Sequence, residues 1–135
     1  MALRLGTTMR DNACNAIVDT IDQGAGAGTI KMYTGAQPAA VSNNPSGTLL
    51  GTLTFSDPAF GNSSTGVATA SAITSDTSAD NSGTCAHAAV YDSDANPLMD
   101  MDAAQGSGTV NFDNNVIVAG GVIAISAMTI TVPIS

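Results

Sequence analysis

Three polar residues in the second half of the chain have the spacing of calcium ligands. Asp92, Asp94 and Asn96 stand at alternate positions, as do the first ligands of an EF-hand loop. The glycine that such a loop needs at its sixth position is Pro97 here, and the bidentate glutamate at its twelfth position is Ala103. We therefore predict a hairpin turn at this point, with a weak divalent-cation site as the alternative, and we expect no metal or other cofactor to be needed.

Asp100 and Asp102 form a second pair of carboxylates that could do chemistry. On a strand they would share one face at a separation of roughly 6.6 Å, which lies within the range of the acid pairs of glycoside hydrolases. Such pairs act from opposite sides of a bond, in a site that raises the pKa of one member. Because these two are neighbours on one strand, we predict a solvated strand edge.

His87 is the single histidine, and it stands two residues after Cys85. A catalytic triad needs a nucleophile, an orienting group and an oxyanion hole, and the sequence has neither a GxSxG motif nor a second base. Two ligands are also too few for zinc, so we expect a core or interface histidine. Cys14 and Cys85 are predicted to be small buried residues with free thiols, with a single disulfide as the alternative. The chain is therefore not expected to be an enzyme.

The distribution of charge argues against further classes of function. Only 10% of the residues are charged, the net charge is −8, and glutamate is absent. All three cations, Arg4, Arg10 and Lys31, lie in the first 31 residues, where three aspartates balance them. The rest of the chain carries all of the net negative charge and would repel phosphates, so we expect no nucleic-acid binding. Two Tyr, three Phe and no Trp offer little aromatic surface on which a sugar could stack.

One segment has the period of a helix. An apolar stripe at four-residue spacing predicts an amphipathic helix over about residues 8–22; the stripe is Met9, Ala13, Ile17 and Ile21, widened by Cys14 and Val18. Thr7 or Thr8 can serve as its N-cap and Gly24 as its stop. With the flexible GAGAG stretch that follows, this gives an N-terminal arm and helix over residues 1–28.

After residue 28 the period changes to two, which is typical of strands. Strands are expected at 29–34, 48–55, 66–73, 84–91, 98–102, 109–112, 115–118 and 121–132. The last of them is apolar on both faces near Ile123 and is expected to be central. Residues 36–47 match neither period and are expected to form an extended loop. The pattern predicts a mainly β fold, a β-sandwich or jelly-roll-like barrel over residues 29–135, with one N-terminal α-helix, in a single domain overall.

We expect neither a signal peptide nor a membrane-spanning helix. The first ten residues, MALRLGTTMR, carry charge and lack the apolar stretch of a signal peptide. Residues 114–135 are uncharged, but their Gly120–Gly121 pair, their Ser and Thr content and their Pro133 argue against a span.

Six stretches span nearly the full length of the chain: MALRLGTTMRDNA, GTIKMYTGAQPA, GTLLGTLTFSDPAFG, GVATASAITSDTSAD, VYDSDANPL and MTITVP. Together they resemble a family of small virion structural proteins of tailed bacteriophages. The resemblance implies a capsid decoration or cement protein on the outer capsid surface, made in the host cytoplasm. Its partners would be the major capsid protein, which it bridges, and copies of itself, for instance in a trimer. The family often has an aromatic pair where this chain has Cys85, Ala86 and His87.

Two other functions stay open. A tail, neck or fibre-associated structural protein would occupy another place in the same virion, and an adhesive or calcium-dependent binding module would use the hairpin at 92–102. For the decoration role, residues 1–22 are expected to attach to a neighbour. Arg4 and Arg10, with Lys31, are the candidate interface residues, and the two arginines would pair with acidic groups on the capsid protein or an adjacent copy. The alternative is that the helix covers an open face of its own sheet.

Overall fold

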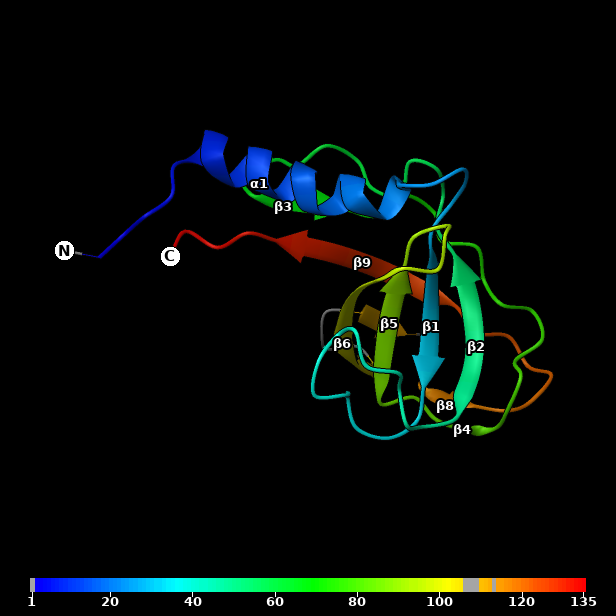
Figure 1. Ribbon diagram of the computed structural model, residues 1–135. Helices are drawn as coiled ribbons and strands as arrows, with labels where there is room; N and C mark the ends of the chain where they lie inside the picture. Colours follow the sequence, from blue (N-terminus) through cyan, green and yellow to red (C-terminus); the bar gives the residue numbers. More distant parts are fainter. Residues whose placement is uncertain (1, 106–109, 113) are drawn as a thin grey trace.

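The computed structural model describes residues 2–105, 110–112 and 114–135. Its elements are α1 (Thr7–Asp19), η1 (Thr20–Asp22), β1 (Thr29–Tyr33), β2 (Leu49–Thr54), β3 (Val67–Thr69), β4 (Gly83–Thr84), β5 (His87–Tyr91), β6 (Pro97–Gln105), β7 (Val110–Phe112), β8 (Val116–Ile117) and β9 (Ile125–Thr131). The fold is mainly β with one N-terminal α-helix, as predicted (Figure 1). The predicted strand 109–112 is described from Val110 onward, and Thr109 lies outside the described residues.

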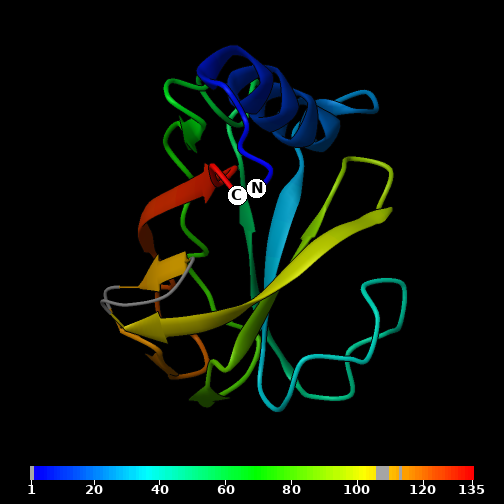
Figure 2. The ribbon, with the colours of Figure 1, turned by 90° about the vertical axis from the view of Figure 1, so that its left-hand side faces the viewer.

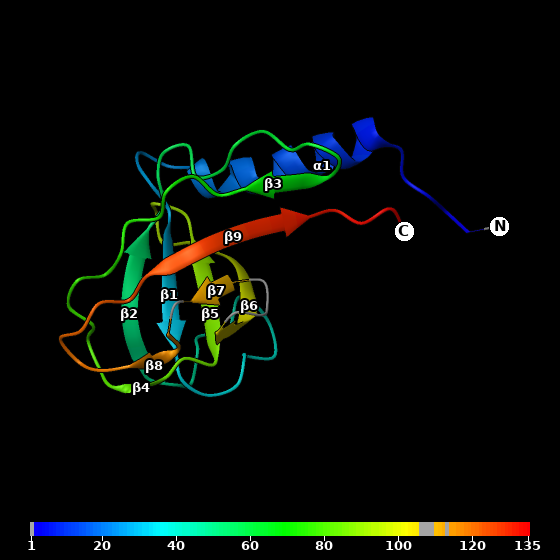
Figure 3. The same cartoon turned by 180° about the vertical axis from the view of Figure 1, so that it is seen from behind.

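Seven strands form one sheet in the order β2-β1-β5-β6-β7-β9-β3, and β4 pairs separately with β8. The strands pair antiparallel, except that β6 and β7 are parallel. Thr54 at the end of β2 bridges to Thr74, and Asp76 bridges to Ile123 shortly before β9. The segment 74–76 therefore links the two sides of the sheet, and the body is barrel-like. Figures 1 and 3 show β1, β2 and β5 on one side of this body and β7, β8 and β9 on the other.

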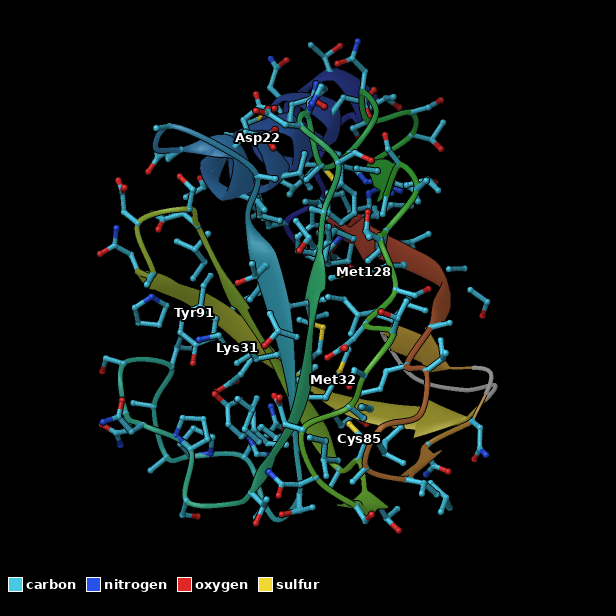
Figure 4. The ribbon with its side chains drawn as sticks, turned by 90° about the vertical axis from the view of Figure 1, so that its right-hand side faces the viewer. Asp22, Lys31, Met32, Cys85, Tyr91 and Met128 are labelled. Atoms are coloured by element: carbon cyan, nitrogen blue, oxygen red, sulfur yellow. The ribbon has the colours of Figure 1, made fainter. Side chains whose placement is uncertain are left out.

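The core fills the space between these two sides. Alternation in β1 buries Ile30 and Met32 and leaves Lys31 and Tyr33 partly exposed. The last strand is internal to the sheet, because β9 pairs with β3 on one side and β7 on the other, as predicted from its apolar faces. The largest fully buried apolar side chains are Ile21, Ile30, Met32, Leu50, Leu53, Val90, Ile123 and Met128. Met32 and Met128 are labelled within the body in Figure 4.

The helix begins within one residue of its predicted start, but α1 ends at Asp19 and the predicted residues 20–22 form the 3-10 helix η1. The N-cap of α1 is Gly6, in an extended conformation and without a side-chain hydrogen bond, so neither Thr7 nor Thr8 caps it. The buried face is also turned: Cys14 and Val18 are buried while Met9, Ala13 and Ile17 are exposed. No helix among the described residues is long and apolar enough to cross a membrane.

Candidate functional site

The candidate calcium ligands form a hairpin turn between β5 and β6. Asp92 is buried, and its Oδ1 accepts the backbone N–H of Asp94 at 3.0 Å and that of Asn96 at 2.9 Å, while its Oδ2 accepts the side-chain amide of Asn96 at 2.9 Å. These bonds, those from Asn96 above all, hold the pKa of Asp92 below the usual range of aspartate. Asp94 is exposed. The loop's own N–H groups already bond to both carboxylate oxygens of Asp92. Asp92, Asp94 and Asn96 therefore form a hydrogen-bonded turn and not a ring of oxygen ligands.

The same turn holds the glycine-rich linker between η1 and β1. Ser93 Oγ donates to the carbonyl of Gln23 at 3.2 Å and accepts the N–H of Gly26 at 3.2 Å. The turn thus ties residues 23–26 to the barrel, a role that the spacing of its acids does not predict. Within the described parts of the chain, no group of three or more His, Cys, Asp and Glu side chains gathers where it could hold a metal ion.

The outer face of β1 and β5 carries the candidate interface residue Lys31. Its ammonium lies 4.8 Å from the ring centroid of Tyr91, a cation–π contact within the chain (Figure 4). Beside it, Tyr33 stacks on His87 with 5.3 Å between ring centroids, and His87 Nδ1 lies 3.0 Å from the carbonyl oxygen of Gly35. Burial, followed by the neighbouring Tyr91, raises the pKa of Tyr33 to about 12. Lys31 therefore has a partner on its own sheet.

His87 is fully buried, as expected for a core or interface histidine. A loop covers it on the outer face of the sheet. Gly35 is the second residue of the loop 34–48 that joins β1 to β2 and contains the loop expected at 36–47, and this loop covers His87. Figure 2 shows the loop standing out from one end of the barrel. The Nε2 atom of His87 has no hydrogen-bond partner among the described residues. Because Nδ1 faces a carbonyl oxygen, it must carry the ring proton in the neutral form of His87.

The paired aspartates lie on β6, as predicted. Asp100 is half-buried and accepts a hydrogen bond from the side-chain amide of Gln37 at 3.1 Å, whereas Asp102 is exposed. Across the sheet they oppose Ala89 and His87. This is a strand surface bordered by the 34–48 loop, and the two carboxylates do not face each other across a cleft.

Cys14 and Cys85 are both free thiols, and both are buried. Cys14 Sγ donates to the carbonyl of Ile130 at 3.4 Å, and Cys85 belongs to the hydrophobic core. Burial raises the pKa of Cys85 to about 11. The prediction of two small buried residues is confirmed.

The helix packs on its own sheet through polar contacts as well as apolar ones. Arg10 Nε donates to the carbonyl of Val132 at 2.9 Å. Asp11 Oδ1 accepts the N–H of Gly66 at 2.7 Å and the hydroxyl of Ser63 at 2.9 Å, and these bonds lower the pKa of Asp11. The structure thus corresponds to the alternative in which the helix covers its own sheet. Arg10, one of the candidate interface residues, is engaged inside the chain.

Two further side chains extend this contact along the helix. Asn15 Oδ1 accepts the N–H of Ser63 at 2.7 Å, and Asp22 Oδ1 accepts the N–H of Ala59 at 2.8 Å. The sequence signal for this docked face is that the short polar residues Asp11, Asn15 and Asp22 recur at helical spacing beside the buried positions. The apolar stripe was right for Cys14, Val18 and Ile21, which are buried, and wrong for Met9, Ala13 and Ile17, which are exposed.

A short segment before the helix extends away from the body. Residues 2–6 run outward beside the C-terminus (Figure 1), and the N–H of Leu5 donates to the carbonyl of Ile134 at 2.8 Å. Arg4 is exposed on this segment, and Leu3 is 79% exposed. The three candidate cations therefore lie apart. Arg4 is on this segment, Arg10 is on the side of α1 that faces the barrel, and Lys31 is on the sheet.

Two groups of exposed apolar side chains lie at opposite ends of the molecule. The helix patch consists of Met9, Ala13 and Ile17 on the outer face of α1, with Met9 64% and Ile17 43% exposed. The valine patch consists of Val116, Val118 and Val122, in and after β8, with Val118 65% and Val122 66% exposed. Figures 1 and 3 place α1 at one end of the barrel and β8 at the other.

Comparisons with known proteins return no match: no family model, no curated protein and no solved structure matches the chain. Its function must therefore be inferred from the chemistry and geometry of its own surfaces. Those surfaces offer two apolar patches and an exposed arginine, rather than a cluster of reactive groups among the described residues.

Proposed function

We propose that this chain is a capsid decoration or cement protein of a tailed bacteriophage, which binds the outer surface of the head and bridges neighbouring major capsid proteins. The observation that carries the proposal is the pair of exposed apolar patches at opposite ends of one barrel. Exposed apolar side chains that are grouped on one element of a small protein favour contact with another protein. A bridging protein needs two such surfaces, because it must hold one capsid subunit at each end.

The charge of the chain favours the outside of a DNA-filled shell. With a net charge of −8 and three cations, the protein has little affinity for phosphate and would stay soluble at high copy number. Sparse charge also leaves large parts of the surface neutral, so contacts with neighbours need little desolvation of ions. Both properties suit a protein that lies close to many copies of itself.

The hydrogen bonds that fix the helix to the barrel favour a protein that resists separation of the two subunits it contacts. Arg10, Asp11 and Asn15 tie α1 to the barrel by hydrogen bonds, and Asp22 does the same for η1, so the helix patch is fixed relative to the valine patch. A rigid connection between two contact surfaces can resist separation of the subunits that they hold. Binding only the expanded shell would then stabilise that form against its alternatives.

Sedimentation with expanded, DNA-free heads tests the proposal. The wild-type chain should pellet with the heads and raise their melting temperature. The double variant Met9→Glu/Ile17→Glu and the double variant Val118→Glu/Val122→Glu should each lose this effect, because a charge in an apolar contact must be desolvated. Val41→Glu is the matched control, since Val41 is an exposed valine in the 34–48 loop, outside both patches. If the wild-type chain stays in the supernatant, or if both patch variants bind as it does, the proposal is wrong.

A further inference from the structure

One strand of the sheet has an edge that is paired over only part of its length. β6 pairs with β5 from Pro97 to Asp102, but its other side pairs with β7 only at Ala103–Gln105. Among the described residues, no strand lies against the 98–102 part of that second side. The described strands therefore leave this part of β6 without a neighbour between it and β9.

The open edge presents backbone hydrogen-bonding groups. The N–H of Ala103 donates to the carbonyl of Ala86, the residue before β5, at 3.2 Å, so the odd-numbered residues of β6 bond toward β5. The N–H and C=O groups of Asp100 and of its even-numbered neighbours point the other way. Unpaired edges of this kind accept an additional strand unless charge or proline blocks them. Here the charges on the edge are the carboxylates of Asp100 and Asp102, which repel an acidic strand and attract a basic one.

The segment before the helix has the properties of that additional strand. Residues 2–6 are outside any helix, Gly6 is extended with φ −69° and ψ 161°, and the segment runs away from the barrel (Figure 1). Its Leu5 N–H donates to the carbonyl of Ile134 in its own C-terminal segment at 2.8 Å, so the added strand would keep this bond on its other side. Five extended residues span about 16 Å, the same length as residues 98–102. The segment carries the exposed Leu3 and Arg4 and no acid. Leu98 and Met99, which are only partly buried, offer apolar contacts at the edge.

We propose that residues 2–6 of one copy add as a strand to the open edge of β6 in a second copy, with Arg4 paired to Asp100 and Asp102. The contact joins two different surfaces, so it repeats head to tail until a ring closes. It specifies how copies meet within the proposed decoration role. It is tested on the isolated protein, so its failure and a failure to bind heads are separate results.

The mass of the full-length protein in solution gives the first test. Light scattering coupled to size exclusion should show oligomers of the wild-type chain. Deletion of residues 2–5, which leaves Gly6 to cap α1, should give monomers with unchanged circular dichroism. A wild-type chain that is monomeric at high micromolar concentration overturns the proposal, as does an oligomer whose mass survives the deletion.

Charge exchange tests the pairing of the two surfaces. Arg4→Glu alone and Asp100→Lys/Asp102→Lys alone should each weaken assembly at least tenfold, because each places like charges together. A chain that carries all three changes should assemble again, since the charges are opposite once more. Failure of the triple variant to assemble, while each parent remains folded, contradicts the pairing.

A proline gives the third test at the level of the backbone. Asp100→Pro removes an N–H that faces away from β5, so the variant keeps its own ladder but cannot donate to an added strand. Asp100→Ala is the control, because it removes the same carboxylate and keeps the N–H. The proline variant should be monomeric and the alanine variant partly assembled; equal assembly of the two excludes strand addition at β6.

Discussion

Arg10 donates a hydrogen bond from its Nε to the backbone carbonyl of Val132 at 2.9 Å, across 122 positions of sequence. The bond joins the N-terminal helix to the chain just after the last strand. Asp11, the next residue, binds Gly66 and Ser63 on the segment that leads into β3. The helix is therefore a part of the barrel, and its outer face is the part that remains available to a partner.

Two isoleucines on consecutive turns test which face of the helix is docked. Ile21 is fully buried whereas Ile17 is 43% exposed. Ile21→Ala should lower the free energy of unfolding by about 2–5 kcal/mol, because it leaves a cavity in the core. Ile17→Ala removes the same atoms from the surface and should cost about 0.5 kcal/mol or less. Urea denaturation of both variants measures the difference, and equal losses would mean that the helix is docked on another face.

Asp11 should make the protein more stable at neutral than at acid pH. Its hydrogen bonds to Gly66 and Ser63 lower the pKa of the folded form, so its contribution is full above the ordinary aspartate pKa and is lost as the pH falls through the folded value. Asp11→Asn should therefore lower the melting temperature at pH 7 by several degrees, with a smaller gap at pH 2. The exposed Asp19 on the same helix gives the control, and Asp19→Asn should leave the melting temperature unchanged at both values.

The hairpin turn should depend on Asp92 and not on a cation. Asp92→Ala removes the acceptor of three hydrogen bonds and should lower the melting temperature, while Asp94→Ala, two residues away and exposed, should have little effect. A chelator should leave the wild-type melting temperature unchanged. If the melting temperature falls by several degrees with chelator, a calcium-dependent binding module is favoured instead.

Cys85 should be unreactive while the protein is folded. Burial raises its pKa to about 11, so the folded thiol remains protonated at pH 8 and is shielded from reagents. A maleimide should label it only after urea is added. The raised value also implies that stability is full below the pKa of the unfolded thiol and falls as the pH rises toward 11, because the unfolded state ionises first. Rapid labelling of the native protein at Cys85 would contradict this burial.

Local patterns were sufficient for the class of fold but not for the way its parts meet. The four-residue spacing placed the start of α1 within one residue, and alternation placed β1 and β2, whereas the strand expected at 121–132 begins only at Ile125. The docked face was predicted only in part, because Asp11, Asn15 and Asp22 are polar and their oxygens accept backbone N–H groups of Gly66, Ser63 and Ala59. These partners lie about 37 to 55 positions away along the sequence, so a local periodicity cannot indicate them.

The sequence predicted which groups of the candidate site could bind a cation, but not the contacts that these groups make. The missing ligands at Pro97 and Ala103 favoured a turn at Asp92, and the structure has one. The clamp of Ser93 on Gln23 and Gly26, and the stacking of Tyr33 on His87, depend on strands brought together by the sheet. The edge of β6 that the described strands leave unpaired likewise depends on how β6 and β7 are placed and not on the sequence of β6 alone.

The number of copies in each particle tests the proposed place of this protein most directly. Quantitative mass spectrometry of purified virions should compare peptides of this chain with peptides of the major capsid protein. A decoration protein repeats with the shell, so hundreds of copies per particle are predicted. A count equal to a small multiple of three or six would match the symmetry of a tail or its fibres and would contradict a role on the head.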